Sequence, residues 1–146
     1  MQSRFWVHAL VLPLVLALAA TASAQTAAPR TPAAEGAIVY FITPTDGAAV
    51  SSPVTVRFGL KGMGVAPAGV ERPATGHHHL LIDTELAHFD RPIPADARHV
   101  HFGGGQTETV IELPPGEHRL QLVLGDRLHI PHEPPVVSER IKISVR

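Results

Sequence analysis

The sequence contains no cysteine, so the domain can hold neither a disulfide nor a thiolate metal site. It also has no excess of positive charge, because 12 Lys and Arg residues face 13 Asp and Glu residues. Without a basic stripe, nucleic acid is a poor partner. There is no glycine-rich phosphate loop, no G-x-S-x-G turn and no H-E-x-x-H motif. The common catalytic motifs are therefore missing, and an enzyme would need a bound metal with an open position.

The N-terminal segment from Met1 to Ala24 has the layout of a secretory signal peptide. Arg4 supplies the positive start, residues 7–20 are almost continuously apolar, and Ala22 to Ala24 form a small-residue cleavage site. The apolar run is short for a membrane span, so an uncleaved anchor is the less favoured alternative. We expect a periplasmic or secreted protein with no membrane span after cleavage.

Past the cleavage site, the chain divides into a leader and one domain. Residues 25–36 are rich in Ala, Thr and Pro and predict a flexible leader. Residues 37–146 are numerous enough for a single hydrophobic core.

The domain shows no 3.6-residue helical stripe and no internal repeat, and its apolar residues alternate in short runs. In one such run Val54, Val56 and Phe58 alternate with polar residues, as in a half-buried strand. Proline and glycine separate these runs. This pattern predicts an all-β, immunoglobulin-like β-sandwich of about seven short antiparallel strands. The expected strands are 37–43, 54–60, 77–83, 99–102, 106–113, 118–124 and 139–145.

Seven of the ten histidines fall in three clusters along the chain, namely His77-His78-His79, His99-Val-His101 and His129-Ile-Pro-His132. Neutral imidazole is the commonest protein ligand for transition metals. Alternate residues of a strand point to one face, so His77 pairs with His79 and His99 pairs with His101. If the two strands are neighbours, these four imidazoles surround one ion. The chemistry suits copper or zinc, and an open position would admit a further ligand.

Three further residues are weaker ligand candidates. His129 and His132 flank Pro131, which holds an extended or turned loop that can reach the edge of the site. The alternative is an ordinary connection to the last strand. Met63 lies between two glycines, and an exposed thioether would suit Cu(I), although a loop methionine is more often a packing residue.

The histidine-rich strands also admit readings without a metal. Imidazoles can line a surface and bond to loop carbonyls and carboxylates, respond to pH, or dock a periplasmic protein or an envelope polymer. His78 shares a face with Leu80 and Ile82, so we expect it to be buried with a structural hydrogen bond. Asp83 and Glu85 can orient imidazoles or simply close a strand.

Several segments resemble the bacterial exported family catalogued as domain of unknown function 4399. The resemblance covers nearly all of the chain after the cleavage site, and the histidine triplet is its most distinctive motif. It implies an exported domain and assigns no activity or catalytic residue. The segments are residues 39–47, 58–69, 75–83, 92–94, 101–103, 105–108 and 122–132.

We predict cleavage after Ala24, because the small-residue site follows the apolar run at the usual distance. The intact mass of protein recovered from the periplasm should then begin at Gln25. A mass that still includes Met1 to Ala24 would contradict the signal-peptide interpretation.

Overall fold

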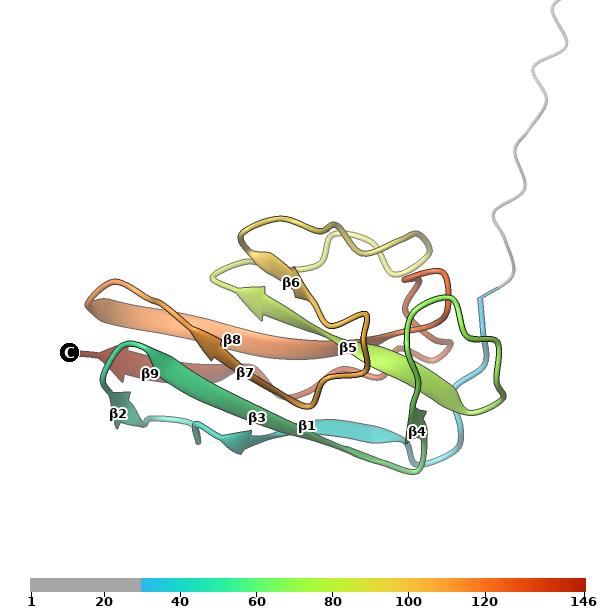
Figure 1. Cartoon of the computed structure of the whole chain (residues 1–146), viewed down its shortest axis with the longest axis horizontal. Helices are drawn as coiled ribbons and strands as arrows, with labels where there is room; N and C mark the ends of the chain where they lie inside the picture. Colours follow the sequence, from blue (N-terminus) through green and yellow to red (C-terminus); the bar gives the residue numbers. More distant parts are fainter. Residues whose placement is uncertain (1–29) are drawn as a thin grey trace, which may run out of the picture.

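The computed structural model describes residues 30–146, which form two β-sheets packed face to face (Figure 1). The predicted signal peptide and the start of the leader lie outside the described residues. No helix in the described part of the chain has the length and apolar character needed to cross a bilayer.

The described residues contain nine strands. The seven predicted strands are all present, and two two-residue strands, β2 and β4, were not predicted. The strands are β1 (Ile38–Thr43), β2 (Ala49–Val50), β3 (Val54–Lys61), β4 (Gly64–Val65), β5 (Thr75–Ile82), β6 (His99–His101), β7 (Glu108–Ile111), β8 (Gly116–Gly125) and β9 (Ile141–Val145).

One sheet has three strands in the order β1-β3-β7, and the other has the order β2-β9-β8-β5-β4 with β6 also paired to β5. The long pairings are antiparallel, as predicted. The two unpredicted strands are exceptions, because β2 runs parallel to β9 and β4 runs parallel to β5. The all-β sandwich is therefore confirmed, whereas its immunoglobulin-like character stays a prediction.

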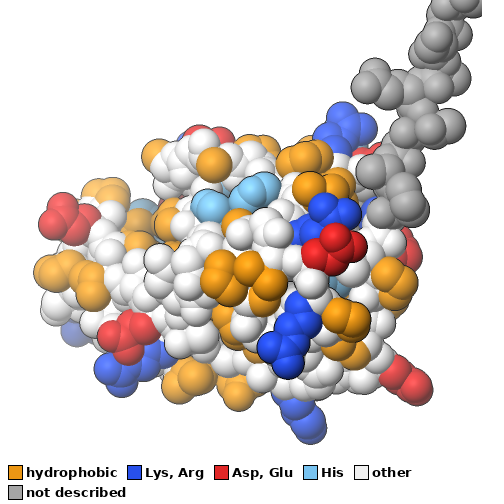
Figure 2. All heavy atoms as spheres, turned by 45° about the vertical axis from the view of Figure 1, so that its right-hand side comes forward, with side chains coloured by type: hydrophobic (Ala, Val, Ile, Leu, Met, Phe, Trp, Pro, Cys, Tyr) orange, Lys and Arg blue, Asp and Glu red, His pale blue; other side chains and the backbone are white. Residues whose placement is uncertain are grey.

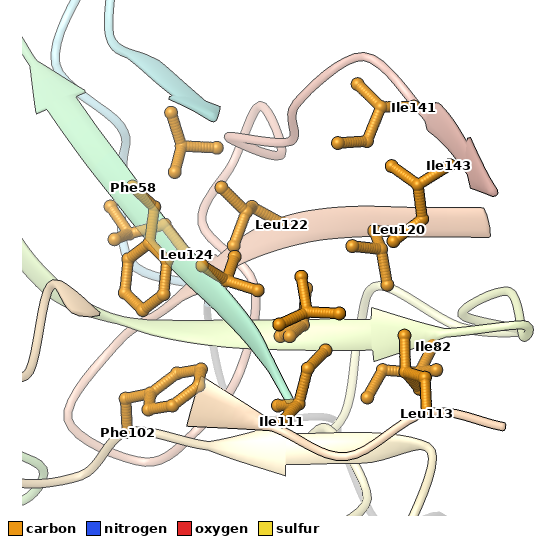
Figure 3. Packing of buried hydrophobic residues seen from close by; sticks show 14 of the residues in the cluster. Phe58, Ile82, Phe102, Ile111, Leu113, Leu120, Leu122, Leu124, Ile141 and Ile143 are labelled. Carbon is orange, nitrogen blue, oxygen red and sulfur yellow. The ribbon is translucent and has the colours of Figure 1, made fainter. Parts of the chain in front are cut away.

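The sandwich core follows from the alternation in the sequence. In β3, Val54, Val56 and Phe58 are buried, while Thr55 and Arg57 are exposed. Facing strands contribute aliphatic side chains in the same way, and Figure 3 shows them interdigitating between the sheets, including Leu120, Leu122 and Leu124 of β8, Ile141 and Ile143 of β9, and Phe102. Burial of these apolar side chains is the main source of stability.

Strand β5 departs from this alternation, because nearly all of its residues are buried. Its inner face carries Leu80 into the sandwich core. Its outer face carries Leu81, which packs with Ile93 and Val123 in a second, smaller cluster. Ile93 belongs to the connection between β5 and β6, so that connection covers the outer face. A strand covered on both faces buries every side chain it carries, including its three histidines.

The last part of the expected leader is attached to the domain. Arg30 donates to the carbonyls of Pro131 and His132 and pairs with Glu133. The backbone N–H of Ala33 donates to the Glu133 carbonyl at 2.9 Å. Arg30 and Ala33 of the expected leader thus contact the loop of residues 131–133, and the flexibility of residues 25–36 stays a prediction.

Leu122 is fully buried in the sandwich core. Truncating it to alanine removes apolar contacts and leaves a cavity, so we expect a loss of about 2–5 kcal/mol in the free energy of unfolding. Denaturant titration of Leu122→Ala measures this. Leu128, 43% exposed, gives the matched control, and Leu128→Ala should cost under about 1 kcal/mol. Equal losses in the two variants would contradict the assigned core.

Candidate metal centre

Strand β5 is paired on both sides, and these pairings bring histidines from distant segments together. On one side His79 lies opposite His101 of β6. On the other side His77 lies opposite Gly125 and His79 opposite Val123 of β8. Directly opposed residues project to the same face of a sheet. His77, His79 and His101 therefore share the outer face of the larger sheet.

A fourth imidazole, that of His129, comes from the loop that follows β8. The buried carboxylate of Asp126 accepts the backbone N–H groups of Leu128 and Ile130 and the hydroxyl of Thr31. Two backbone bonds close the turn, from the His129 N–H to the Asp126 carbonyl and from the Asp126 N–H to the Ile130 carbonyl. This turn holds His129 at a φ of 65°, a left-handed conformation in which histidine is enriched.

The same loop is tied to the connection that covers β5. The backbone N–H of Ile93 donates to the His129 carbonyl at 2.9 Å. This hydrogen bond joins the connection between β5 and β6 to the loop that follows β8. The backbone of His129 is therefore fixed both by its own turn and by the neighbouring connection.

The ligand-forming nitrogens of His77, His79, His101 and His129 all lie within 4.8 Å of one another. His77 Nε2 is 3.0 Å from His79 Nε2 and 3.2 Å from His129 Nδ1. A tetrahedral ion with metal–nitrogen bonds of about 2.0–2.1 Å needs donors about 3.3 Å apart. The arrangement can therefore hold one transition-metal ion after small ring movements.

The four imidazoles differ in their access to solvent. His77 and His79 are no more than 1% exposed, His129 is half-buried, and His101 is exposed. Figure 2 shows histidine side chains next to one another at the surface of this part of the molecule. The site is therefore enclosed on the β5 side and open on the β6 side.

Two glycines leave room for the imidazoles. A Cβ atom at Gly125 would stand 2.9 Å from His79 Nε2, and one at Gly103 would stand 2.3 Å from His101 Cε1. Both distances are too short for a normal contact. The two rings therefore pack directly on backbone, and a larger residue at either position would displace a candidate ligand atom.

The site favours neutral imidazoles, the form that binds metals. Burial first, and then the neighbouring histidines, lower the pKa of His77 to about 4 and that of His79 to about 2. Burial also lowers the pKa of His101, with His129 contributing. The negative charge of the buried Asp126 carboxylate opposes this effect, because it raises the pKa of His77. These lone pairs are therefore free for a metal at neutral pH.

The other predicted ligands lie outside this group of four. His99 is on the same strand as His101, but its Nδ1 contacts Asp96 Oδ1 at 2.9 Å. His132 is fully buried, with its ring nitrogens near the carbonyls of Thr75 and Leu124. Met63 packs against the sandwich core. The structure thus brings together His77, His79, His101 and His129, and gives His99, His132 and Met63 other contacts.

His78 is buried on the inner face, as predicted, with its ring centroid 4.7 Å from that of Phe58. Neither ring nitrogen makes a hydrogen bond of normal geometry within the described residues, although the backbone of Gln106 lies close enough to act against the lowering of the His78 pKa. The register of β5 determines this position, since His78 alternates with His77 and His79. A polar side chain is thereby placed in an apolar core.

Neither acidic residue considered earlier orients the four imidazoles. Asp83 binds His118 Nδ1 at 2.6 Å and the backbone N–H of Arg119, and Glu85 pairs with Arg140. Sequence reasoning missed the residue that does shape the site, Asp126. The Gly-Asp pair that follows the β8 run was the available signal, because Asp favours turns through bonds to nearby backbone.

A family model matches residues 56–146, and its description is Domain of unknown function (DUF4399). The match covers more than half of the chain. The chain belongs to this family. The matched region contains all four clustered histidines, Asp126 and both glycines. No curated protein and no solved structure matches the chain.

The buried histidines should make the metal-free protein sensitive to mild acid. Burial lowers the pKa of His78 to about 4, so below pH 6.5 the unfolded chain binds a proton that the folded chain does not. Stability should fall as the pH drops from about 6.5 to 5. Denaturant titrations across this range should show a slope shallower by about 1 kcal/mol per pH unit in His78→Leu.

Comparing wild type with this variant is necessary because His118 has the opposite effect. Burial opposes its charged form, but bonds to Asp83 and the Pro114 carbonyl raise its pKa. Its contribution is therefore present below pH 6.5 and is lost as the pH rises through its folded pKa. Identical slopes for wild type and His78→Leu would show that His78 is not held neutral.

Proposed function

We propose that this domain binds one divalent transition-metal ion, zinc or copper, through His77, His79, His101 and His129. The observation that carries the proposal is the convergence of imidazole nitrogens from two strands and a loop onto one point. We further propose that it does so as an exported protein, a view supported by the signal-peptide pattern of residues 1–24.

The metal-free arrangement cannot satisfy its own polar atoms. Each neutral imidazole nitrogen carries either one N–H or one lone pair. His77 Nε2 faces both His79 Nε2 and His129 Nδ1, and one N–H or lone pair makes only one well-aligned hydrogen bond. A cation accepts the lone pairs of both Nε2 atoms and of His129 Nδ1 at once, which removes the conflict at His77 Nε2.

The donor atoms restrict the metal. Nitrogen donors suit zinc and copper(II), whereas copper(I) prefers thiolates and thioethers. The one loop methionine considered for copper(I), Met63, packs against the sandwich core instead. With only imidazole donors gathered at the site, the chemistry favours the divalent ions.

The alternative function was a metal-free domain whose histidine face docks a protein or an envelope polymer. Such a surface needs exposed imidazoles, but His77 and His79 are buried. Burying polar rings without hydrogen-bond partners costs free energy. A docking surface makes no use of these buried rings, whereas a metal would use their converging Nε2 lone pairs.

Untagged, metal-free mature protein should gain thermal stability when zinc or copper(II) is added at neutral pH. At a hundredfold excess over Kd, binding to the folded state alone contributes about 2.7 kcal/mol. For a domain of this size the melting temperature should rise by roughly 10 °C. Differential scanning fluorimetry measures the shift, and elemental analysis after dialysis gives the number of bound ions.

The double variant His101→Ala/His129→Asn should lose most of this gain while keeping the metal-free fold. Asparagine tolerates the left-handed backbone at position 129, so only the imidazole is removed. The matched control is His88→Ala/His99→Ala, which removes two histidines outside the site and should keep the full shift. A full shift in the first variant, or none in wild type, would refute the proposal.

A further inference from the structure

The four candidate ligands are held with unequal firmness. His77 and His79 lie on a strand with pairing partners on both sides, and both are buried. His129 is held by the turn around Asp126 and by the bond from Ile93. These three donors are therefore fixed before a metal arrives, which lowers the cost of binding.

His101 is held far less firmly. It is the last residue of the three-residue strand β6, and its side chain is exposed. Its ring packs on the backbone of Gly103, which has no side chain to contact the ring. The ring packs against those of His77, His79 and His129, with centroids 4.7–5.1 Å apart, and makes no hydrogen bond to the described residues. Rotation of this exposed ring would leave the pairing of β5 intact.

The other sides of the site are more covered than the side of His101. Strand β8 flanks His77 and His79, and Gly125 packs against the ring of His79. On the remaining side the loop of residues 126–130 is tied to the connection that contains Ile93, and His129 is half-buried there. The most exposed approach to the metal is therefore the position that His101 occupies.

We propose that the coordination position of His101 is exchangeable, so that the bound metal accepts one external neutral nitrogen donor there, such as a partner protein's imidazole. This inference rests on the proposed metal site and adds a route by which metal enters and leaves. Three fixed protein donors with one replaceable position are also the pattern of open metal sites.

The donor set favours nitrogen at this position. The three other candidate ligands are imidazoles, and nitrogen donors suit zinc and copper(II). An incoming imidazole would therefore replace the His101 ring with a donor of the same kind.

The test uses copper(II) as a spectroscopic probe of the full mature protein. His101→Ala should still bind copper(II), but more weakly than wild type, because one of the four nitrogen donors is missing. Millimolar imidazole should restore the visible absorption and the electron paramagnetic resonance spectrum of the wild-type four-nitrogen site. The same imidazole should restore the spectrum of His129→Asn much less, because His129 is half-buried in its loop whereas His101 is exposed. His88→Ala should behave as wild type throughout.

The outcomes separate this inference from the metal site itself. If wild type binds no copper(II), the proposed function fails. If wild type binds copper(II) but imidazole leaves the His101→Ala spectrum unchanged, the exchangeable position is refuted while the metal site stands. Restoration by azide but not by imidazole would refute the neutral donor. Equal rescue of His101→Ala and His129→Asn would refute the assignment of the open position to His101.

Discussion

The central constraint in this domain is the two-sided pairing of β5. Its register with β8 and β6 places His78 in the sandwich core and His77 and His79 on the opposite face, beside His101. A shift of one residue would exchange the two faces and place two imidazoles in the core. The apolar side chains on both faces of β5, Leu80 on one and Leu81 on the other, oppose such a shift. Core packing and the geometry of the site thus depend on the same register.

The covering loops convert a row of strand histidines into an enclosed site. The turn built on Asp126 positions His129, and the connection containing Ile93 excludes water from the outer face of β5. Exclusion of water lowers the pKa of the enclosed imidazoles and leaves their nitrogens without solvent partners. Polar groups buried in this way cost stability. Under the proposed function, a bound cation would use the converging Nε2 lone pairs of His77 and His79.

The strands and part of the site could be predicted from the sequence, and the physical reasons can be named. Period-two alternation gave the strands and their faces, including the burial of His78 and the shared face of His77 and His79. It could not show that loops cover that face, because covering depends on tertiary contacts such as that of Ile93. The sequence also could not show that His129, and not His132, joins the site. That outcome depends on the turn around Asp126 and on the positive φ of His129. The contact of His99 with Asp96 is local, because the two residues are three apart in the chain, and such a contact is predictable from sequence spacing.

The central claim is that four particular imidazoles surround one ion, and nuclear magnetic resonance of the histidine side chains tests it most directly. Long-range ¹H–¹⁵N spectra of uniformly labelled, untagged protein would be recorded before and after one equivalent of zinc. The account predicts large ¹⁵N shifts for His77 Nε2, His79 Nε2 and His129 Nδ1, a shift in the ring of His101, and unchanged rings for His88 and His118. Zinc-dependent shifts confined to His88, His99 or His118, with the four clustered rings unaffected, would contradict it.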